Sequence, residues 1–248
     1  MEFQSMNTIS AIIPVYNGRA FIRSTMESVW NQTLPPSEIV LVDDGSVDGS
    51  IQLLQELAEE SPIPCTIFQQ ANKGPASSRN LAVRHSTGSI IAFLDQDDIW
   101  HPEYLATQVQ RISLTPYESY SICHFNYFVD AGYLQRHGEI PAWVRPEFLT
   151  RPQPGYLPSC MVMYKDVFLK VGNFDESLRS GYDTDWIVRA IDSGVELDIN
   201  TEVLVDRRIH SENQTSNVAA LHKDAIRMVH KMILRRRALS TDSNPQNQ

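Results

Sequence analysis

Residues 89–98 read SIIAFLDQDD, a run of mostly aliphatic residues that passes directly into an acidic turn. The run Ser89–Leu94 is typical of a buried strand. The carboxylates of Asp95, Asp97 and Asp98 repel one another in one turn unless a cation lies among them, and oxygen ligands of this kind suit Mg²⁺ or Mn²⁺. The same residues also suit a solvated turn that caps a helix, so the turn alone leaves both interpretations open.

Upstream of this strand, short apolar runs alternate with helical patterns. The expected elements are strand Ile9–Val15, helix 20–32, strand Ile39–Val42, helix 49–59, strand Cys65–Gln69 and helix 75–84. This alternation predicts an α/β fold with a mostly parallel, doubly wound sheet. Ligands of such sheets bind beyond the carboxyl ends of the strands. The polar residues that follow the strands, at 16–17, 43–44 and 95–98, are therefore expected around one crevice.

The second half of the chain has a less regular pattern. The expected elements are helix 102–113, strand Ser121–Val129, strand Cys160–Tyr164, helix Lys165–Val171, helix Thr184–Asp192 and two short strands, 195–200 and 202–206. Between them, residues 140–158 are rich in proline and predict a long irregular loop, typical of a lid or binding segment. Its aromatic residues Trp143 and Tyr156 either stack on an acceptor sugar or fix the loop to the core.

Composition limits the class of protein. The chain has 248 residues, 42% of them hydrophobic, which predicts one large domain over residues 1–216 with a helical appendage at 217–240 and a disordered tail at 241–248. A net charge of -9 argues against a nucleic-acid binder. Cys65, Cys123 and Cys160 show no CxxC spacing and are expected as small buried hydrophobes. No signal-peptide pattern or membrane-spanning apolar run is found, so a cytoplasmic protein is expected.

The appendage is predicted as a basic amphipathic helix. An apolar stripe runs along Leu221, Ala225, Met228, Val229, Met232 and Ile233, and the polar side carries Lys223, Arg227, Lys231 and the triplet 235–237. Such helices can lie on anionic membranes, which leaves a peripheral membrane contact open. The narrow stripe, poor in Trp and Phe, favours packing on the domain instead.

Two further segments suit phosphate and acid–base chemistry. A Gly-Pro turn at Gly74 opens a helix with Lys73 and Arg79 nearby, and helix N-termini and basic side chains both attract phosphate. A Gly-Pro turn also commonly precedes a helix that binds no phosphate. Asp183 precedes the expected helix Thr184–Asp192, where a helix cap is the simpler interpretation.

The order of these segments resembles the family 2 glycosyltransferases of the GT-A fold, over about residues 8–210. The motifs that carry the resemblance are Ile12-Ile13-Pro14-Val15-Tyr16-Asn17, Val42-Asp43-Asp44-Gly45-Ser46, Asn72-Lys73-Gly74 with Arg79-Asn80, Asp95-Gln96-Asp97-Asp98 and Gly172-Asn173-Phe174-Asp175-Glu176. The resemblance implies an inverting transferase that uses Mn²⁺ or Mg²⁺ to move a sugar from a nucleoside diphosphate, with UDP favoured. It also implies a hydroxyl acceptor, a glycan or glycoconjugate.

The resemblance assigns roles to single residues. For the nucleotide sugar these are Pro14, Tyr16 and Asn17 at the first strand end, Asp44 at the base, Lys73 and Arg79 in the segment that holds the nucleotide, and Asp95 at the ribose and donor sugar. Asp97 is implied as the metal ligand and His210 as a residue near the diphosphate and metal. Asp183 is implied as the catalytic base.

The chain also departs from the family pattern. Many relatives carry Glu-Asp where this chain has Tyr182-Asp183, which puts the role of the first carboxylate in doubt. The Gly-Gly that precedes Phe-Asp-Glu is reduced to Gly172-Asn173. Two other functions are weighed, a nucleotidyltransferase and a non-catalytic nucleotide-sugar binding module. The short turn after the first strand lacks the Gly-rich, basic loop of the former, and the presence of Asp97 and Asp183 argues against the latter.

Overall fold

The computed structural model describes residues 8–141, 144–210, 213 and 218–242. Its strands are β1 (Ile9–Val15), β2 (Glu38–Asp43), β3 (Cys65–Gln69), β4 (Ile90–Phe93), β5 (Ile99–Trp100), β6 (Ser119–Val129), β7 (Gln153–Pro154), β8 (Met161–Tyr164) and β9 (Glu196–Ile209). Its helices are α1 (Ile22–Trp30), α2 (Ser50–Glu60), α3 (Pro75–His85), α4 (Tyr104–Leu114), α5 (Ala131–His137), α6 (Lys165–Val171), α7 (Tyr182–Asp192) and α8 (Val218–Asp242), with short 3-10 turns η1 (Pro146–Leu149) and η2 (Pro158–Cys160).

The strands form one sheet in the order β3-β2-β1-β4-β8-β6-β9-β5, with β7 paired to β6. β1, β2, β3 and β4 run parallel to their neighbours within this group, as expected for strands joined by crossover helices. From β4 onward the sheet is mixed, because β8 pairs antiparallel with both β4 and β6 while β9 pairs parallel with β6. The α/β prediction is confirmed.

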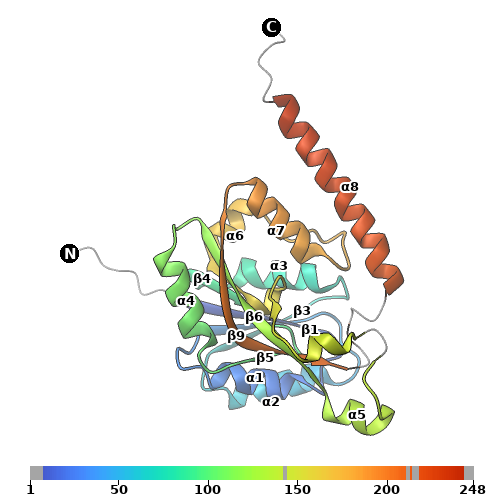
Figure 1. The fold of residues 1–248 in the computed structure, drawn as a ribbon. Coiled ribbons are helices and arrows are strands. Elements are labelled where there is room, and N and C mark those ends of the chain that lie inside the picture. Colours follow the sequence, from blue (N-terminus) through green and yellow to red (C-terminus); the bar gives the residue numbers. More distant parts are fainter. Residues whose placement is uncertain (1–7, 142–143, 211–212, 214–217, 243–248) are drawn as a thin grey trace, which may run out of the picture.

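Helices cover both faces of the sheet (Figure 1). Successive strand residues point to opposite faces, so Ala11 and Ile13 belong to one core cluster and Ile12 to another. The first cluster takes apolar side chains from α1, α2 and α4, and the second takes them from α3, α6 and α7. The near-continuous apolar sequence of β1 follows from this burial on both faces.

Three expectations need correction. Residues 195–206 do not form two strands, because β9 continues from Glu196 to Ile209 along β6 with shifts in the pairing register near His124. The loop 140–158 is not wholly irregular, since it contains η1 and the short strand β7. Cys65 is only half-buried, because it lies on β3 at the edge of the sheet, whereas Cys123 and Cys160 are buried.

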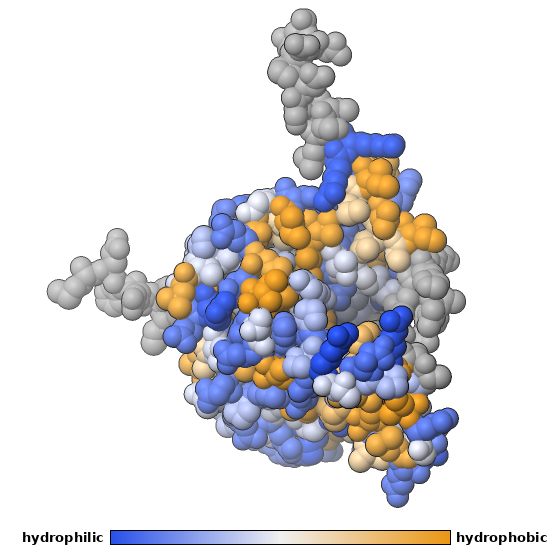
Figure 2. Space-filling model, viewed as in Figure 1, coloured by the Kyte–Doolittle hydropathy of each residue, from blue (hydrophilic) through white to orange (hydrophobic). Residues whose placement is uncertain are grey.

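Helix α8 lies against the α7 side of the molecule and projects beyond it (Figure 1). Three of its basic side chains pair with the domain: Lys231 with Asp175, Arg235 with Asp185 at 2.7 Å, and Arg236 with Asp192 at 3.0 Å. Its apolar side is divided, with Met228 packed on the core and Ile226, Val229, Ile233 and Leu234 exposed. These four exposed residues form an apolar strip on α8, and Figure 2 shows orange, hydrophobic surface along this helix.

Some of the predicted features involve residues or side chains that the structure does not describe. Trp143, the side chains of Leu221 and Lys223, and the tail residues 243–248 lie outside the described residues or side chains. Of the helices in the described part of the chain, none is long and apolar enough to cross a membrane.

Candidate functional site

A pocket of about 760 Å³ opens at the carboxyl ends of β1, β2 and β4. Its wall contains nine of the residues singled out from sequence: Pro14, Tyr16, Asn17, Asp44, Arg79, Asp95, Asp97, Asp183 and His210. The tenth, Lys73, has an exposed side chain that does not line the pocket. The parallel half of the sheet therefore gathers the predicted residues at the edge where ligands of doubly wound sheets bind.

The acidic turn after β4 divides into two parts. Carboxylate oxygens of Asp95, Asp97 and Asp98 lie within 4.8 Å of one another. Asp95 and Asp97 line the pocket, whereas Asp98 is buried behind them and accepts a hydrogen bond from Ser159 Oγ at 2.7 Å. Burial, together with the charges of Asp97 and Asp95, raises the pKa of Asp98 well above its usual range. Asp98 thus supports the turn from within, and Asp95 and Asp97 face the pocket.

Asp97 is held by residues from the far end of β9. Its Oδ2 lies 2.7 Å from His210 Nε2 and accepts a hydrogen bond from Asn213 Nδ2 at 3.3 Å. The clustered carboxylates of Asp95 and Asp97 form a donor set that fits Mg²⁺ or Mn²⁺, since both ions take carboxylate oxygens, and the imidazole of His210 adjoins it through Asp97. The residues present can therefore hold a divalent cation at Asp97.

Asp44 organises the turn that starts α3. Its carboxylate accepts hydrogen bonds from the backbone N–H groups of Lys73 at 2.9 Å and Gly74 at 2.7 Å, and from Gln70 Nε2 at 2.8 Å. Gly74 has a φ of +94°, a conformation that favours glycine. Lys73 therefore contributes to the site through its backbone. Oδ2 of Asp44 accepts only one of the three bonds and retains capacity for a ligand donor.

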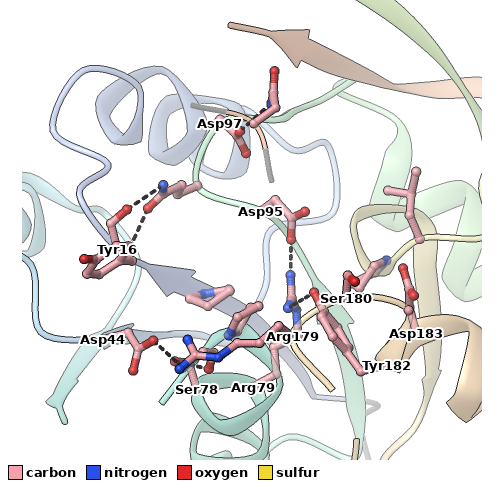
Figure 3. Close-up of a pocket in the computed structure, with 18 of the residues that line it drawn as sticks. Tyr16, Asp44, Ser78, Arg79, Asp95, Asp97, Arg179, Ser180, Tyr182 and Asp183 are labelled. Atoms are coloured by element: carbon pink, nitrogen blue, oxygen red, sulfur yellow. Dashed lines mark hydrogen bonds and ion pairs between the residues drawn. The ribbon is translucent and has the colours of Figure 1, made fainter. Parts of the chain in front are cut away.

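The turn after β1 is tied to the acidic turn by Gln96. The Gln96 side chain accepts from the Tyr16 N–H at 2.7 Å and donates to the Tyr16 carbonyl at 3.0 Å (Figure 3). A Cβ on Gly18 would lie 2.3 Å from Gln96 Oε1, so a larger residue there would have to displace the Gln96 amide. Asn17 adopts a φ of 51° and accepts a bond from the Val47 N–H at 2.9 Å. The aromatic ring of Tyr16 remains 45% exposed at the pocket.

Arg79 connects α3, the acidic turn and α7. Its guanidinium is buried, pairs with Asp95 and donates to the Tyr182 hydroxyl at 2.7 Å (Figure 3). Burial lowers the pKa of Arg79, but Tyr182 and Asp95 raise it overall. Tyr182 thus supplies an oxygen acceptor for this arginine where many relatives have a glutamate, without adding a second negative charge beside Asp183.

Asp183 lies in the first turn of α7, on the pocket wall. Burial raises the pKa of its carboxyl group, against the lowering effects of the Thr184 N–H, Arg79 and Arg207. The helix cap is Gly181, so Asp183 does not cap α7 as the simpler interpretation of the sequence holds. A carboxylate with a raised pKa is suited to accept a proton.

Two of the sequence motifs, Asn80 and the segment 172–176, connect helices rather than line the pocket. Asn80, next to Arg79, donates to the Phe174 carbonyl at 2.9 Å and accepts from the Phe174 N–H at 3.0 Å. Arg189 of α7 donates to the carbonyl of Val171 at 2.8 Å and to that of Asn173 at 2.8 Å. The motif at 172–176 therefore joins α3 to α7, and with them Arg79 to Asp183.

Sequence reasoning missed several residues of the pocket. Arg207 and Phe125 line it from β9 and β6, and Asn213 lies beside Asp97. The loop Arg179–Gly181 lines it before α7, held by Asp224 of α8. Alternation along β9 indicates that Arg207 and Arg208 face opposite sides. No signal in the sequence indicates which of the two faces a ligand.

The model of the family described as "Glycosyl transferase family 2" matches residues 10–172, well over half of the chain. Glycosyltransferase AglE of Haloferax volcanii is 29% identical over 199 residues, covering 79% of this chain and 65% of the relative. The putative teichuronic acid biosynthesis glycosyltransferase TuaG of Bacillus subtilis is 36% identical over 102 residues, 41% of this chain and 40% of the relative. The match to these curated relatives thus spans less than two thirds of their length.

Solved structures of transferases share the fold. S. aureus TarS 1-349 in complex with UDP superposes with a TM-score of 0.66 at 19% identity, covering 92% of this chain and 65% of TarS. The mannosyltransferase PcManGT of Pyrobaculum calidifontis, in complex with GDP-Man and Mn2+, superposes with a TM-score of 0.69 at 20% identity, covering 91% of this chain and 64% of PcManGT. The sheet described above is that of the GT-A fold. The chain belongs to glycosyl transferase family 2.

Proposed function

We propose that this protein is an inverting glycosyltransferase that moves a sugar from a nucleoside diphosphate, preferably UDP, to a hydroxyl group of a glycan or glycoconjugate. The observation that carries the proposal is that Asp183, with its raised pKa, lines the same pocket as Asp95 and Asp97. A proton acceptor and a metal-binding turn in one pocket supply the two kinds of group that sugar transfer from a diphosphate needs.

The donor lies along the parallel half of the sheet in this proposal. Asp44 Oδ2 accepts from the base, and the exposed ring of Tyr16 and the ring of Pro14 form the adjacent wall. Asn17 fixes the turn beside them, and Lys73 acts through its backbone N–H on Asp44. Proteins of the same fold have been solved with UDP, UDP-GlcNAc and GDP-Man, which supports a nucleotide sugar as donor.

Asp97 and His210 hold the divalent cation, Mn²⁺ or Mg²⁺, and Arg79 fixes Asp95 toward the donor sugar. When bound, the cation offsets the negative charge that develops on the leaving diphosphate. Asp183 takes the proton of the acceptor hydroxyl while the oxygen bonds to the anomeric carbon. The bond from that carbon to the diphosphate breaks in the same step, so a single displacement inverts the configuration.

For α8 we propose packing on the domain, of the two roles that the sequence leaves open. Lys231, Arg235 and Arg236 form ion pairs with the domain. These basic side chains are therefore not available to bind anionic lipid headgroups. Co-sedimentation of the full-length protein with anionic liposomes at low salt would contradict this. A peripheral membrane contact would then be the role of the exposed apolar strip.

A panel of nucleotide sugars, scored for released nucleoside diphosphate with and without Mn²⁺, tests the function. Metal-dependent release from at least one donor is the expected result. Binding without release, in the presence of broad acceptor mixtures, would favour the non-catalytic binding module. Release of pyrophosphate from a nucleoside triphosphate and a sugar phosphate would instead identify a nucleotidyltransferase.

A further inference from the structure

Arg207 is a cation on the pocket wall. Within the part of the chain that the structure describes, its guanidinium makes no hydrogen bond and no ion pair within 4.0 Å. Its neighbour Arg208, on the other side of β9, donates to Asp130 at 3.1 Å, to Ser24 at 3.0 Å and to the Asp97 carbonyl at 3.0 Å. The guanidinium of Arg208 is thus bonded to other parts of the domain, whereas that of Arg207 makes no such bond with the described residues.

Aromatic rings and distant carboxylates keep Arg207 in place and charged. Its guanidinium carbon lies 5.9 Å from the ring centre of Phe125 and 5.7 Å from that of Tyr127. Burial alone lowers the pKa of Arg207, but Asp98, Tyr127 and Asp95 raise it overall. Arg207 is half-buried, and a charge that is partly removed from water without a direct partner is a candidate for binding a ligand of opposite charge.

The order of the strands places Arg207 away from the nucleotide base. Asp44 follows β2 and the acidic turn follows β4, while Arg207 belongs to β9, beyond β8 and β6. The acidic turn lies between Asp44 and Arg207 and borders β9 on the Arg207 side, because β5, which follows the turn, pairs with β9 with Ile99 opposite Asp206. Close to Arg207 the pocket is lined by Phe125 of β6 and by Pro154 of β7, which pairs with β6. A donor with its base at Asp44 and its diphosphate at Asp97 leaves this end for the acceptor.

We propose that Arg207 binds an oxyanion of the acceptor, a phosphate or a carboxylate, so that the acceptor is an anionic glycan or glycoconjugate. This inference rests on the proposed function. The planar guanidinium offers paired N–H donors that match both groups, and the rings of Phe125 and Tyr127 restrict its orientation. The acceptor hydroxyl would then be oriented toward Asp183 by a charged anchor as well as by stacking.

The test uses isothermal titration of the full-length protein with methyl phosphate, after saturation with Mg²⁺ and whichever of UDP or GDP it binds. Acetate, titrated in the same way, distinguishes carboxylate from phosphate. The variants are Arg207→Met, which removes the charge, and Arg207→Lys, which keeps it without the planar fork. Arg145→Met is the matched control, because Arg145 also lies over an aromatic ring, 5.9 Å from that of Phe148, but outside the pocket.

We expect Arg207→Met to weaken oxyanion binding by about tenfold or more and Arg207→Lys to weaken it less, with nucleotide affinity and the Arg145→Met control near wild type. Unchanged oxyanion binding in Arg207→Met overturns the inference. So does a parallel tenfold loss of nucleotide affinity, which would place Arg207 on the donor diphosphate. If the wild type binds neither nucleotide, the proposed function itself fails. If Arg207→Met does not fold, the Arg207→Lys titration decides, and equal oxyanion affinity there overturns the inference.

Discussion

The two halves of the pocket are built in different ways. On the proposed nucleotide side, three wall residues lie within two positions of a strand end: Tyr16 after β1, Asp44 after β2 and Asp95 after β4. On the proposed acceptor side, the wall comes from β6, β7, α7 and β9, and the loop before α7 is held by α8. Parallel strands bring consecutive strand ends to one edge, so the first side is local in sequence. The second side depends on pairings between distant segments.

The largest expected effect is on the catalytic base. Asp183→Asn keeps the shape of the side chain but cannot accept a proton, so kcat should fall by about 10²–10⁴-fold. Affinity for the nucleoside diphosphate, measured by titration, should stay near wild type because Asp44 and Asp97 are unchanged. Transfer at a near-normal rate at neutral pH would show that Asp183 is not the base and that the acceptor side has been misassigned.

The pH profile sharpens the same comparison. Burial raises the pKa of Asp183 above the usual value for aspartate of about 3.9, and only its deprotonated form can act as a base. Transfer should therefore decline as the pH falls through the raised pKa, starting at a higher pH than an exposed aspartate would give. In Asp183→Asn, the residual rate should lack this acidic decline.

Asp97→Ala tests the border between the two sides. Loss of this carboxylate removes the ligand that His210 and Asn213 position, and turnover should fall by about 10²–10³-fold. The melting temperature should change little, because Asp97 is partly exposed, with a side-chain exposure of 17%. Asp98→Ala is the contrast, since Asp98 is buried and bonded to Ser159, and its loss should lower the melting temperature. Full activity of wild type in excess chelator would contradict a metal role.

Asp224→Ala asks whether α8 contributes to the acceptor side. The buried Asp224 carboxylate accepts from the N–H groups of Arg179 at 3.1 Å and Ser180 at 3.0 Å, just before Asp183. Its removal leaves these donors unpaired at a cost of about 1–3 kcal/mol, and kcat should fall about tenfold with little change in nucleotide affinity.

The matched control for α8 is Arg236→Ala. It removes an exposed ion pair between α8 and Asp192 that does not touch the loop at 179–181, so kcat should stay near wild type. Equal losses in Asp224→Ala and Arg236→Ala would mean that α8 only stabilises the fold.

The smallest effect is expected at Tyr156, which lines the pocket and is 45% exposed. Tyr156→Ala should raise the acceptor KM several-fold, about 1 kcal/mol, through loss of stacking, and leave donor affinity unchanged. A larger change in donor affinity than in acceptor KM would move the segment around β7 to the donor side.

Much of the fold and the proposed nucleotide side of the pocket could be predicted from the sequence, because both depend on short contiguous segments. Apolar runs that end in polar turns specified β1, β2 and β4 together with Tyr16, Asp44 and the acidic turn. Even there, local chemistry misled at Lys73, where the backbone rather than the amine meets Asp44. Charge and motif position do not say which way a long side chain points.

The sequence by itself determined the strand–helix rhythm, the edge at which ligands bind and the carboxylates that gather there, because each depends on residues adjacent in the chain. Only the tertiary structure decided that Tyr182 accepts from Arg79, that Asp224 holds the loop before Asp183 and that Arg207 rather than Arg208 faces the pocket. These contacts depend on the register of β6 with β9 and on the packing of α7 and α8. Both are set by the burial of whole faces rather than by any local pattern.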